Sequence, residues 1–338
     1  MEGRELTRLH LIMRMIVMKI LRGTLAAVSA AAMLGLAACS AYSDAPASGA
    51  PASSGGTARL AVAVAFYPFE FVAERVGGDQ VAVTNLTAPG VEPHDLELTP
   101  QQVASLSSVD LVVYQSGFQP AVDTAVAQAK PRASVDTASF LPLLAASQDG
   151  AEGDGHTADD GHNHGAADPH TWLDPTNMVT IAEHVRDALS SARPEAAKAF
   201  AANTEALVAD LTTLDTTLKT DLGSCAIKPF ITSHAAFGYL ANRYGLTQVG
   251  INGVEPDVEP SAARIAEVQK IAKDNNVTTI FFETLVSPVV AQSIAGDLGL
   301  KTDVLDPLEG ITAESRGTDY LEVMRANGAS LKTANQCS

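Results

Sequence analysis

Four of the chain's eight histidines lie in one short stretch, 154–175, which reads DGHTADDGHNHGAADPHTWLDP. Imidazole nitrogens bind zinc and other divalent transition metals, so histidines crowded in this way predict a metal site. His170 stands in the segment DPHTWLDP at the end of the stretch. The other three stand among Gly, Ala and Asp, and they are His156, His162 and His164.

These three histidines allow two hypotheses, and the residues do not choose between them. In the first, the His-rich loop 152–167 is a low-affinity zinc collector that supplies a main site or senses the supply of metal. In the second, the loop is a solvated segment that binds metal only incidentally. His170, where the loop rejoins the fold, is the histidine we assign to the main site.

Other side chains that could bind a metal stand at or just beyond the ends of predicted strands. They are His94, His234, Glu283 and Asp306. In open parallel sheets, ligands bind in the crevice beyond the carboxyl ends of the strands. Two facing lobes would therefore bring such side chains together. The two carboxylates could equally cap the helices that follow them.

Three neutral imidazoles and one carboxylate form a donor set with a clear metal preference. They suit a tetrahedral Zn²⁺ site, whereas Ca²⁺ and Mg²⁺ prefer shells made only of oxygen. Manganese would be expected to draw more carboxylates. The residue types therefore favour zinc.

The elements that would position these residues follow an α/β pattern. Apolar, β-branched runs such as 59–65 (RLAVAVA) and 109–114 (VDLVVY) alternate with helical stretches, which indicates parallel sheets. We expect an N-terminal lobe over 58–193 and a C-terminal lobe over 223–338. Between them, 194–222 predicts one helix of roughly 43 Å, which is long for a single lobe and better suited to a rigid connecting rod. Its apolar stripe consists of Leu207, Leu211, Leu214 and Leu218.

Length and charge limit the possible functions. A chain of 338 residues can bury two sizeable cores. Its formal net charge of −17 argues against nucleic acid as a partner, because a phosphate-binding surface needs a basic stripe.

The first 38 residues differ in kind from the rest. Lys19 and Arg22 precede a short apolar run that ends in Leu-Ala-Ala-Cys, which is typical of an export signal whose Cys39 becomes the lipidated N-terminus of the mature protein. An uncleaved membrane anchor is the alternative, although the apolar run is rather short for a span. The segment 39–57, rich in Ala, Ser, Gly and Pro, predicts a flexible tether.

Two further cysteines, Cys225 and Cys337, remain if Cys39 carries lipid. In an oxidising compartment, we expect them to form a disulfide that ties the C-terminus to the second lobe. Two unpaired buried thiols are the alternative.

Six segments of the chain resemble, in order, the solute-binding lipoproteins of zinc and manganese ABC importers. The resemblance covers essentially the whole chain from about residue 58. The segments are GVEPHDLELTP (90–100), DPHTWLDP (168–175), TSHAAFGYLANRYGL (232–246), EPSAARIAEV (259–268), FFETLVSP (281–288) and LDPLEG (305–310).

The resemblance implies two α/β lobes bridged by a rigid helix, with the metal between the lobes. Carried over residue by residue, it places three histidine ligands on His94, His170 and His234 and a carboxylate ligand on Asp306, with Glu283 or water as alternatives for the fourth position. Members of the zinc type have His at the third position, as at His234 here, which Ala-Ala-Phe follows. They also commonly carry an acidic, His-rich insertion before the second ligand.

The leading hypothesis is a monomeric binding protein without catalysis. It would be held to the membrane by lipid on Cys39, capture Zn²⁺ outside the membrane, and pass it to a permease driven by a cytoplasmic ATPase. A manganese or iron carrier and a surface adhesin are alternatives, because the resemblance extends to both. A zinc hydrolase is less favoured, because the sequence shows no His-Glu-x-x-His helix and no motif for a nucleophilic Ser or Cys.

Overall fold

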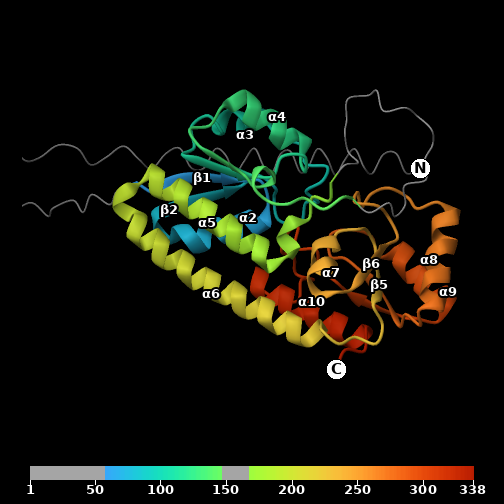
Figure 1. Ribbon diagram of the computed structural model, residues 1–338. Helices are drawn as coiled ribbons and strands as arrows, with labels where there is room; N and C mark the ends of the chain where they lie inside the picture. The colour runs from blue at the N-terminus through green and yellow to red at the C-terminus, as the bar shows by residue number, and fades with distance from the viewer. Residues whose placement is uncertain (1–57, 147–166) are drawn as a thin grey trace, which may run out of the picture. The chain divides into compact units, whose positions relative to one another are not determined.

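The computed structural model describes residues 58–146 and 167–338. The predicted signal segment, Cys39 and the tether lie outside the described residues, as do His156, His162 and His164. Figure 1 shows the arrangement of the helices and strands. They form two α/β lobes, each built on a parallel sheet of four strands, as the sequence predicts.

The first lobe is built on a parallel sheet with the strand order β2-β1-β3-β4. Its apolar runs are buried on both faces, as is usual where helices cover a parallel sheet. The strands are β1 (Leu60–Val64), β2 (Val81–Asn85), β3 (Leu111–Tyr114) and β4 (Ser134–Asp136). The helices are α2 (Tyr67–Gly77), α3 (Pro100–Ser105), α4 (Pro120–Ala129) and α5 (Pro175–Ala192).

The second lobe repeats this plan with the strand order β6-β5-β7-β8, again parallel. A separate apolar core lies between this sheet and the helices α8 and α9. The strands are β5 (Pro229–Thr232), β6 (Thr247–Gly250), β7 (Thr279–Phe282) and β8 (Lys301–Val304). The helices are α7 (Gly238–Tyr244), α8 (Ala262–Asp274), α9 (Val289–Leu298) and α10 (Tyr320–Ala334).

The long helix α6 (Ala197–Leu222) follows one 3-10 turn at Pro194–Ala196 and packs against α2, α5 and α10 (Figure 1). The predicted leucine stripe is its buried face, with Leu207, Leu211, Leu214 and Leu218 at most 1% exposed. Because α2 and α5 belong to the first lobe and α10 to the second, the same stripe contributes to a core that spans both.

Strands β4 and β6 have no counterpart in the sequence prediction. Each is an edge strand with a single apolar side chain, Val135 in β4 and Val249 in β6, so no apolar run marks it in the sequence. Local sequence sets the ends of two helices: Thr99 Oγ1 accepts a hydrogen bond from the backbone N of Gln102 at the start of α3, and Gly245 ends α7 at φ 69°.

The disulfide expected between Cys225 and Cys337 is present and bridges 112 positions of sequence. Adjacent backbone hydrogen bonds, from Ala226 N to Gln336 O and from Ser338 N to Ser224 O, hold the C-terminal residues beside the segment that follows α6.

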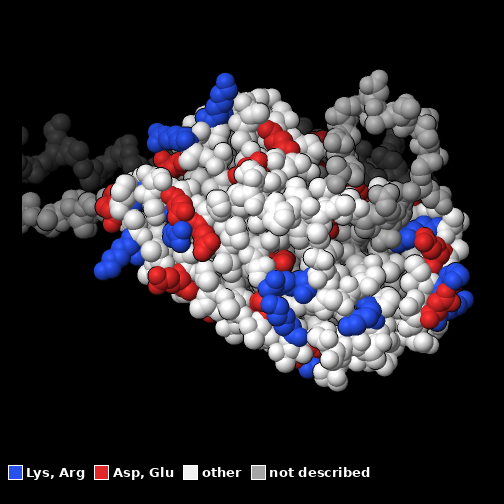
Figure 2. Space-filling view, in the orientation of Figure 1, with Lys and Arg blue, Asp and Glu red and all other residues white. Residues whose placement is uncertain are grey.

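On the face drawn in Figure 2, acidic and basic side chains stand in small mixed groups separated by uncharged surface. Lys270 and Asp274, one helical turn apart on α8, form an ion pair. In the part of the chain that the structure describes, no helix combines the length and apolar character needed to cross a membrane.

Candidate metal centre

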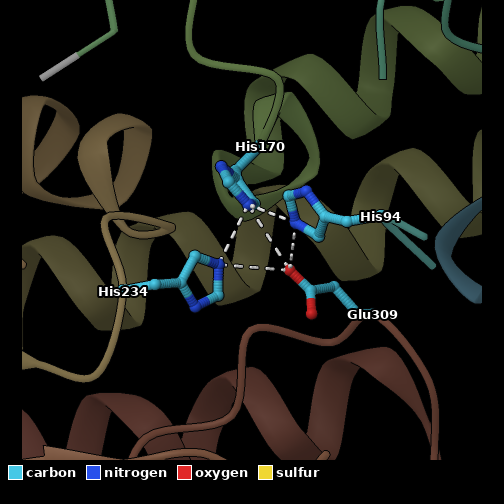
Figure 3. A group of neighbouring side chains, drawn as sticks. All are labelled: His94, His170, His234 and Glu309. Atoms are coloured by element: carbon cyan, nitrogen blue, oxygen red, sulfur yellow. Dashed lines mark hydrogen bonds and ion pairs between the residues drawn. The ribbon is translucent and has the colours of Figure 1, made fainter. Parts of the chain in front are cut away.

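Four buried side chains meet between the two lobes with their ligand atoms pointing toward one another (Figure 3). Two come from the first lobe and two from the second, and we call them the His3Glu group. Its members are His94 in the loop after β2, His170 just before α5, His234 after β5, and Glu309 in the loop after β8.

The distances within the His3Glu group match a tetrahedral zinc site. Nε2 of His170 lies 3.3 Å from Nε2 of His94 and 3.2 Å from Nε2 of His234. Oε1 of Glu309 lies 3.4 Å from Nε2 of His94 and of His170, and 3.5 Å from Nε2 of His234. Ligands about 2.0–2.1 Å from a tetrahedral Zn²⁺ are about 3.3–3.4 Å from one another. The ligand atoms therefore need little adjustment to receive the ion.

Each imidazole is oriented by a second carboxylate at its other nitrogen. Nδ1 of His170 lies 2.8 Å from Asp168 Oδ1, and Nδ1 of His234 lies 2.7 Å from Glu283 Oε2. Nδ1 of His94 lies 3.3 Å from Glu255 Oε2. A proton on Nδ1 leaves the lone pair of Nε2 free to face the centre, which is the arrangement typical of metal-binding histidines.

Local backbone structure holds two of these pairs in place. Asp168 Oδ1 also accepts a hydrogen bond from the backbone N of His170, so one carboxylate oxygen holds both the backbone and the ring. Glu283 directly follows β7, the strand next to β5. Its Oε1 accepts a hydrogen bond from the backbone N of His234, while its Oε2 contacts the ring. Glu283 was predicted as an alternative or outer ligand, and it lies in the outer position.

The centre is shielded by aromatic rings of the first lobe. The ring of Phe118 meets His94 edge-on at 4.7 Å between centroids, and the indole of Trp172 lies 5.2 Å from the ring of His170. Trp172 also donates a hydrogen bond from Nε1 to Pro307 O in the second lobe, 2.7 Å away. These contacts exclude water and brace the two lobes against each other.

The electrostatics of the group favour the binding of a cation. Burial alone lowers the pKa of His94, yet hydrogen bonds to Glu255 and Glu309 raise it to about 9. Burial acts in the same direction on His234, but the charge of Glu283 raises its pKa well above the usual value. Burial raises the pKa of Glu309, and hydrogen bonds from the three histidines nevertheless hold it well below the usual value. The site therefore concentrates negative charge that a proton or a metal must balance.

Glu309 also shows an unsatisfied atom. Its Oε2 is buried and has no hydrogen-bond partner, which is costly for a carboxylate in a protein interior. A divalent cation at the centre would supply the missing charge. The donor set of three imidazoles and one carboxylate fits Zn²⁺.

Asp306, expected as the fourth ligand, does not belong to the His3Glu group. Its Oδ1 accepts a hydrogen bond from the backbone N of Leu308, and its Oδ2 accepts one from Ser315 Oγ. Its backbone exchanges two further hydrogen bonds with the side chain of Asn327. Both carboxylate oxygens are thus used to build the turn after β8.

The carboxylate that reaches the centre is Glu309, three residues beyond Asp306, and it was not among the ligands predicted from the sequence. Leu308 between them adopts a left-handed backbone at φ 59° and is fully buried. This turn directs Glu309 toward the histidines. The available signal was its place in the segment LDPLEG, which already carried part of the resemblance.

The remaining described histidine, His184, lies on α5 and stacks on Phe140 with 3.7 Å between ring centroids. The accessory histidines of the loop 152–167 lie outside the described residues.

Comparison with known proteins identifies relatives that bind or take up zinc. The model of the family described as zinc-uptake complex component A, periplasmic, matches residues 62–334. The zinc-binding lipoprotein AdcA of Streptococcus pneumoniae (strain ATCC BAA-255 / R6) is 36% identical over 280 residues, which are 81% of this chain and 55% of AdcA. The high-affinity zinc uptake system protein ZnuA of Bacillus subtilis (strain 168) is 34% identical over 280 residues, covering 81% of this chain and 87% of that protein.

A solved structure, that of the Zn(II)-bound ZnuA-like domain of Streptococcus pneumoniae AdcA, has a TM-score of 0.68 at 34% identity. The match covers 82% of this chain and 99% of that domain. The chain spans about half the length of the AdcA proteins it matches. The extent of the family match, together with the two-lobe fold, shows that the chain belongs to the family of zinc-uptake complex component A.

Proposed function

We propose that the chain captures Zn²⁺ outside the cytoplasmic membrane and delivers it to an ABC-type permease. The observation that carries this proposal is the His3Glu group, whose ligand atoms lie at the spacing of a tetrahedral zinc site. In this proposal His94, His170, His234 and Glu309 are the ligands and the metal is the cargo. The zinc-binding and zinc-uptake relatives support this assignment.

The completeness of the shell supports binding over catalysis. A catalytic zinc keeps an open position for water or substrate, whereas four protein ligands fill a tetrahedron. The side chains of His170, His234 and Glu309 are fully buried, so a substrate has no direct access to the ion. We therefore place the chain among transport proteins and not among zinc hydrolases.

The placement of two ligands on each lobe supports reversible capture. Separating the lobes would split the His3Glu group into two pairs, and neither pair alone completes a tetrahedron. Release to the permease then needs only a small relative movement of the lobes. A cytoplasmic ATPase would drive transport, and lipid on Cys39 would keep a monomeric binding protein beside its permease.

The proposal is tested by titrating metal-free protein with Zn²⁺ and Mn²⁺ in competition. We expect one tightly bound zinc per chain and no displacement of zinc by an equal concentration of manganese. Displacement by manganese or iron would assign the chain to the alternative class of carriers. Metal-dependent turnover of ester, peptide or β-lactam substrates would overturn the transport assignment, as would adhesion to host proteins with no effect on zinc uptake.

The location is tested on cells. We expect the mature chain in the membrane fraction, with a mass that includes lipid on Cys39. We also expect a Cys39→Ala variant to be released from the membrane and still to bind zinc.

A further inference from the structure

The three carboxylates that orient the histidines are not equivalent. Asp168 and His170 lie two residues apart in the first lobe, and Glu283 and His234 follow neighbouring strands of the second lobe. The third pair joins the lobes, because His94 belongs to the first and Glu255 to the second. Only this pair must break when the lobes separate.

The third pair is also the most accessible. The side chains of Asp168 and Glu283 are 5% and 1% exposed, whereas that of Glu255 is 46% exposed. Its contact with His94 is longer, at 3.3 Å against 2.8 and 2.7 Å for the other two. An exposed carboxylate can leave such a contact and remain solvated, so opening it costs less than breaking either buried pair.

Glu255 stands on the β6–α8 loop (251–261), and this loop is attached beside another ligand. The backbone N of Asn252 donates to Ser233 O, and Ala235 N donates to Gly253 O, each at 2.8 Å. These hydrogen bonds flank His234 on both sides. The side chain of Asn252 further donates to Pro256 O at 2.7 Å and so closes the backbone around Glu255. The loop therefore moves with His234 while its tip contacts His94.

The same loop also brings Asp257 close to acidic side chains of the first lobe, which opposes the attraction between Glu255 and His94. The carboxylate of Asp257 lies within 4.8 Å of those of Glu92 and Asp95 in the first lobe. Like charges at this separation repel one another. The attraction of Glu255 for His94 thus works against a repulsion two residues away, which keeps the closed state easy to reverse.

From these contacts we propose that Glu255 is a positioning residue that sets how long the protein retains its zinc. While the lobes are closed, Glu255 holds the proton on Nδ1 of His94, so that the Nε2 lone pair faces the ion. When the loop withdraws, His94 loses this partner and becomes a weaker ligand. The inference rests on the proposed function and concerns the release of the same cargo.

The test measures zinc dissociation and association separately in the full chain. Trp172 is the protein's only tryptophan and lies beside His170, so its fluorescence should report occupancy of the site. Zinc-loaded protein is mixed with excess chelator in a stopped-flow instrument. Glu255→Ala should release zinc about 10–100-fold faster, the range typical for loss of a carboxylate behind a metal-binding histidine. Its association rate should stay within about threefold of wild type, because affinity differences arise mainly in dissociation.

The chain offers a matched control and a conservative variant. Glu259→Gln removes the same charge from an exposed side chain of the same loop and should leave the dissociation rate unchanged. Glu255→Gln keeps an oxygen that accepts the Nδ1 proton, so its rate should fall between those of Glu255→Ala and wild type. Nitrogen-15 spectra of the zinc-loaded variants should show the His94 signals shifted in Glu255→Ala and those of His170 and His234 unmoved.

Each outcome decides between the two proposals. If wild type binds zinc but Glu255→Ala releases it at the rate of Glu259→Gln, the role of Glu255 is refuted. It is also refuted if all three histidines shift together, since the variant would then have disturbed the fold. If wild type itself binds no zinc, the proposed function fails.

Discussion

Oε1 of Glu309 lies 3.4 Å from Nε2 of His94, although 215 positions of sequence separate the two residues. One residue belongs to the N-terminal lobe and the other to the C-terminal lobe, so this contact exists only when the lobes face each other. The same two atoms would become ligands of one ion. Under the proposed function, an ion held by both residues would therefore tie the two lobes together.

Replacing each carboxylate in turn by its amide distinguishes the role of Glu309 from that of Asp306. Glu309→Gln should weaken zinc binding by more than the roughly 10–100-fold expected for an outer partner, because it removes the only anionic ligand. Asp306→Asn keeps Oδ1 as an acceptor for the backbone N of Leu308 and should change affinity much less. Competition with a chelator of known affinity measures both variants. A larger loss of zinc affinity in Asp306→Asn than in Glu309→Gln would instead identify Asp306 as the ligand.

Zinc affinity should fall as the pH falls from about 9 to about 6. The pKa of His94 in the metal-free protein is raised to about 9, so near neutral pH this histidine holds a proton that zinc must displace. Calorimetry in buffers of different ionisation enthalpy should detect protons released on binding. A zinc affinity that does not change over this pH range would contradict the role of His94 as a ligand that must lose a proton.

The stability of the metal-free protein should change with pH in the opposite direction. A histidine whose pKa is higher in the folded than in the unfolded chain stabilises the fold fully below the unfolded value of about 6.5. This contribution is lost as the pH rises through about 9, the folded-state pKa of His94. The metal-free protein should therefore melt at a lower temperature near pH 9 than near pH 6.5. Zinc-loaded protein serves as the control and should not follow this trend.

Gly238→Ala should weaken zinc binding although Gly238 is not a ligand. A Cβ atom at this position would overlap Oδ2 of Asp168, whose other oxygen holds His170. We expect zinc affinity to fall about tenfold, as for other changes behind a ligand. The matched control is Gly296→Ala on α9, where a Cβ atom meets nothing within 4 Å. Equal affinities of the two variants would show that Asp168 does not position His170.

Removing the disulfide should cost stability and leave the ligands in place. The bridge from Cys225 to Cys337 spans 112 positions, and the chain-entropy model assigns a loop of this length roughly 4–5 kcal/mol. Denaturant unfolding with and without reductant measures the loss. The Cys225→Ala/Cys337→Ala double variant should no longer respond to reductant. If reductant lowered the stability of that variant equally, the loss in the wild type could not be attributed to this disulfide.

Deleting residues 153–166 should weaken tight zinc binding much less than replacing His94, His170 or His234 by Ala. The segment contains the three accessory histidines but none of the His3Glu group. Titration of the deletion variant should still show one tight site. Loss of tight binding on deletion alone would move the main site into the loop.

The sequence was sufficient for the features that depend on local pattern. Apolar, β-branched runs that alternate with helical stretches indicated two α/β lobes. The leucine spacing in 194–222 indicated the face of α6 that packs against both lobes. Histidines just beyond predicted strands could be assigned to one edge of each sheet, since parallel strands end together there. The edge strands β4 and β6 escaped prediction, because each carries a single apolar side chain and so lacks an apolar run.

The sequence by itself thus determined the lobes, the three histidines and the class of metal, because residue type and strand order carry that information. Only the tertiary structure decided which carboxylate joins them. Asp306 and Glu309 are both acidic, and they stand three positions apart. The choice depends on a left-handed turn at Leu308, which is held by burial and by the hydrogen bonds that Asp306 makes with Ser315 and Asn327. Long-range packing, and not local propensity, sets that backbone conformation and so selects Glu309.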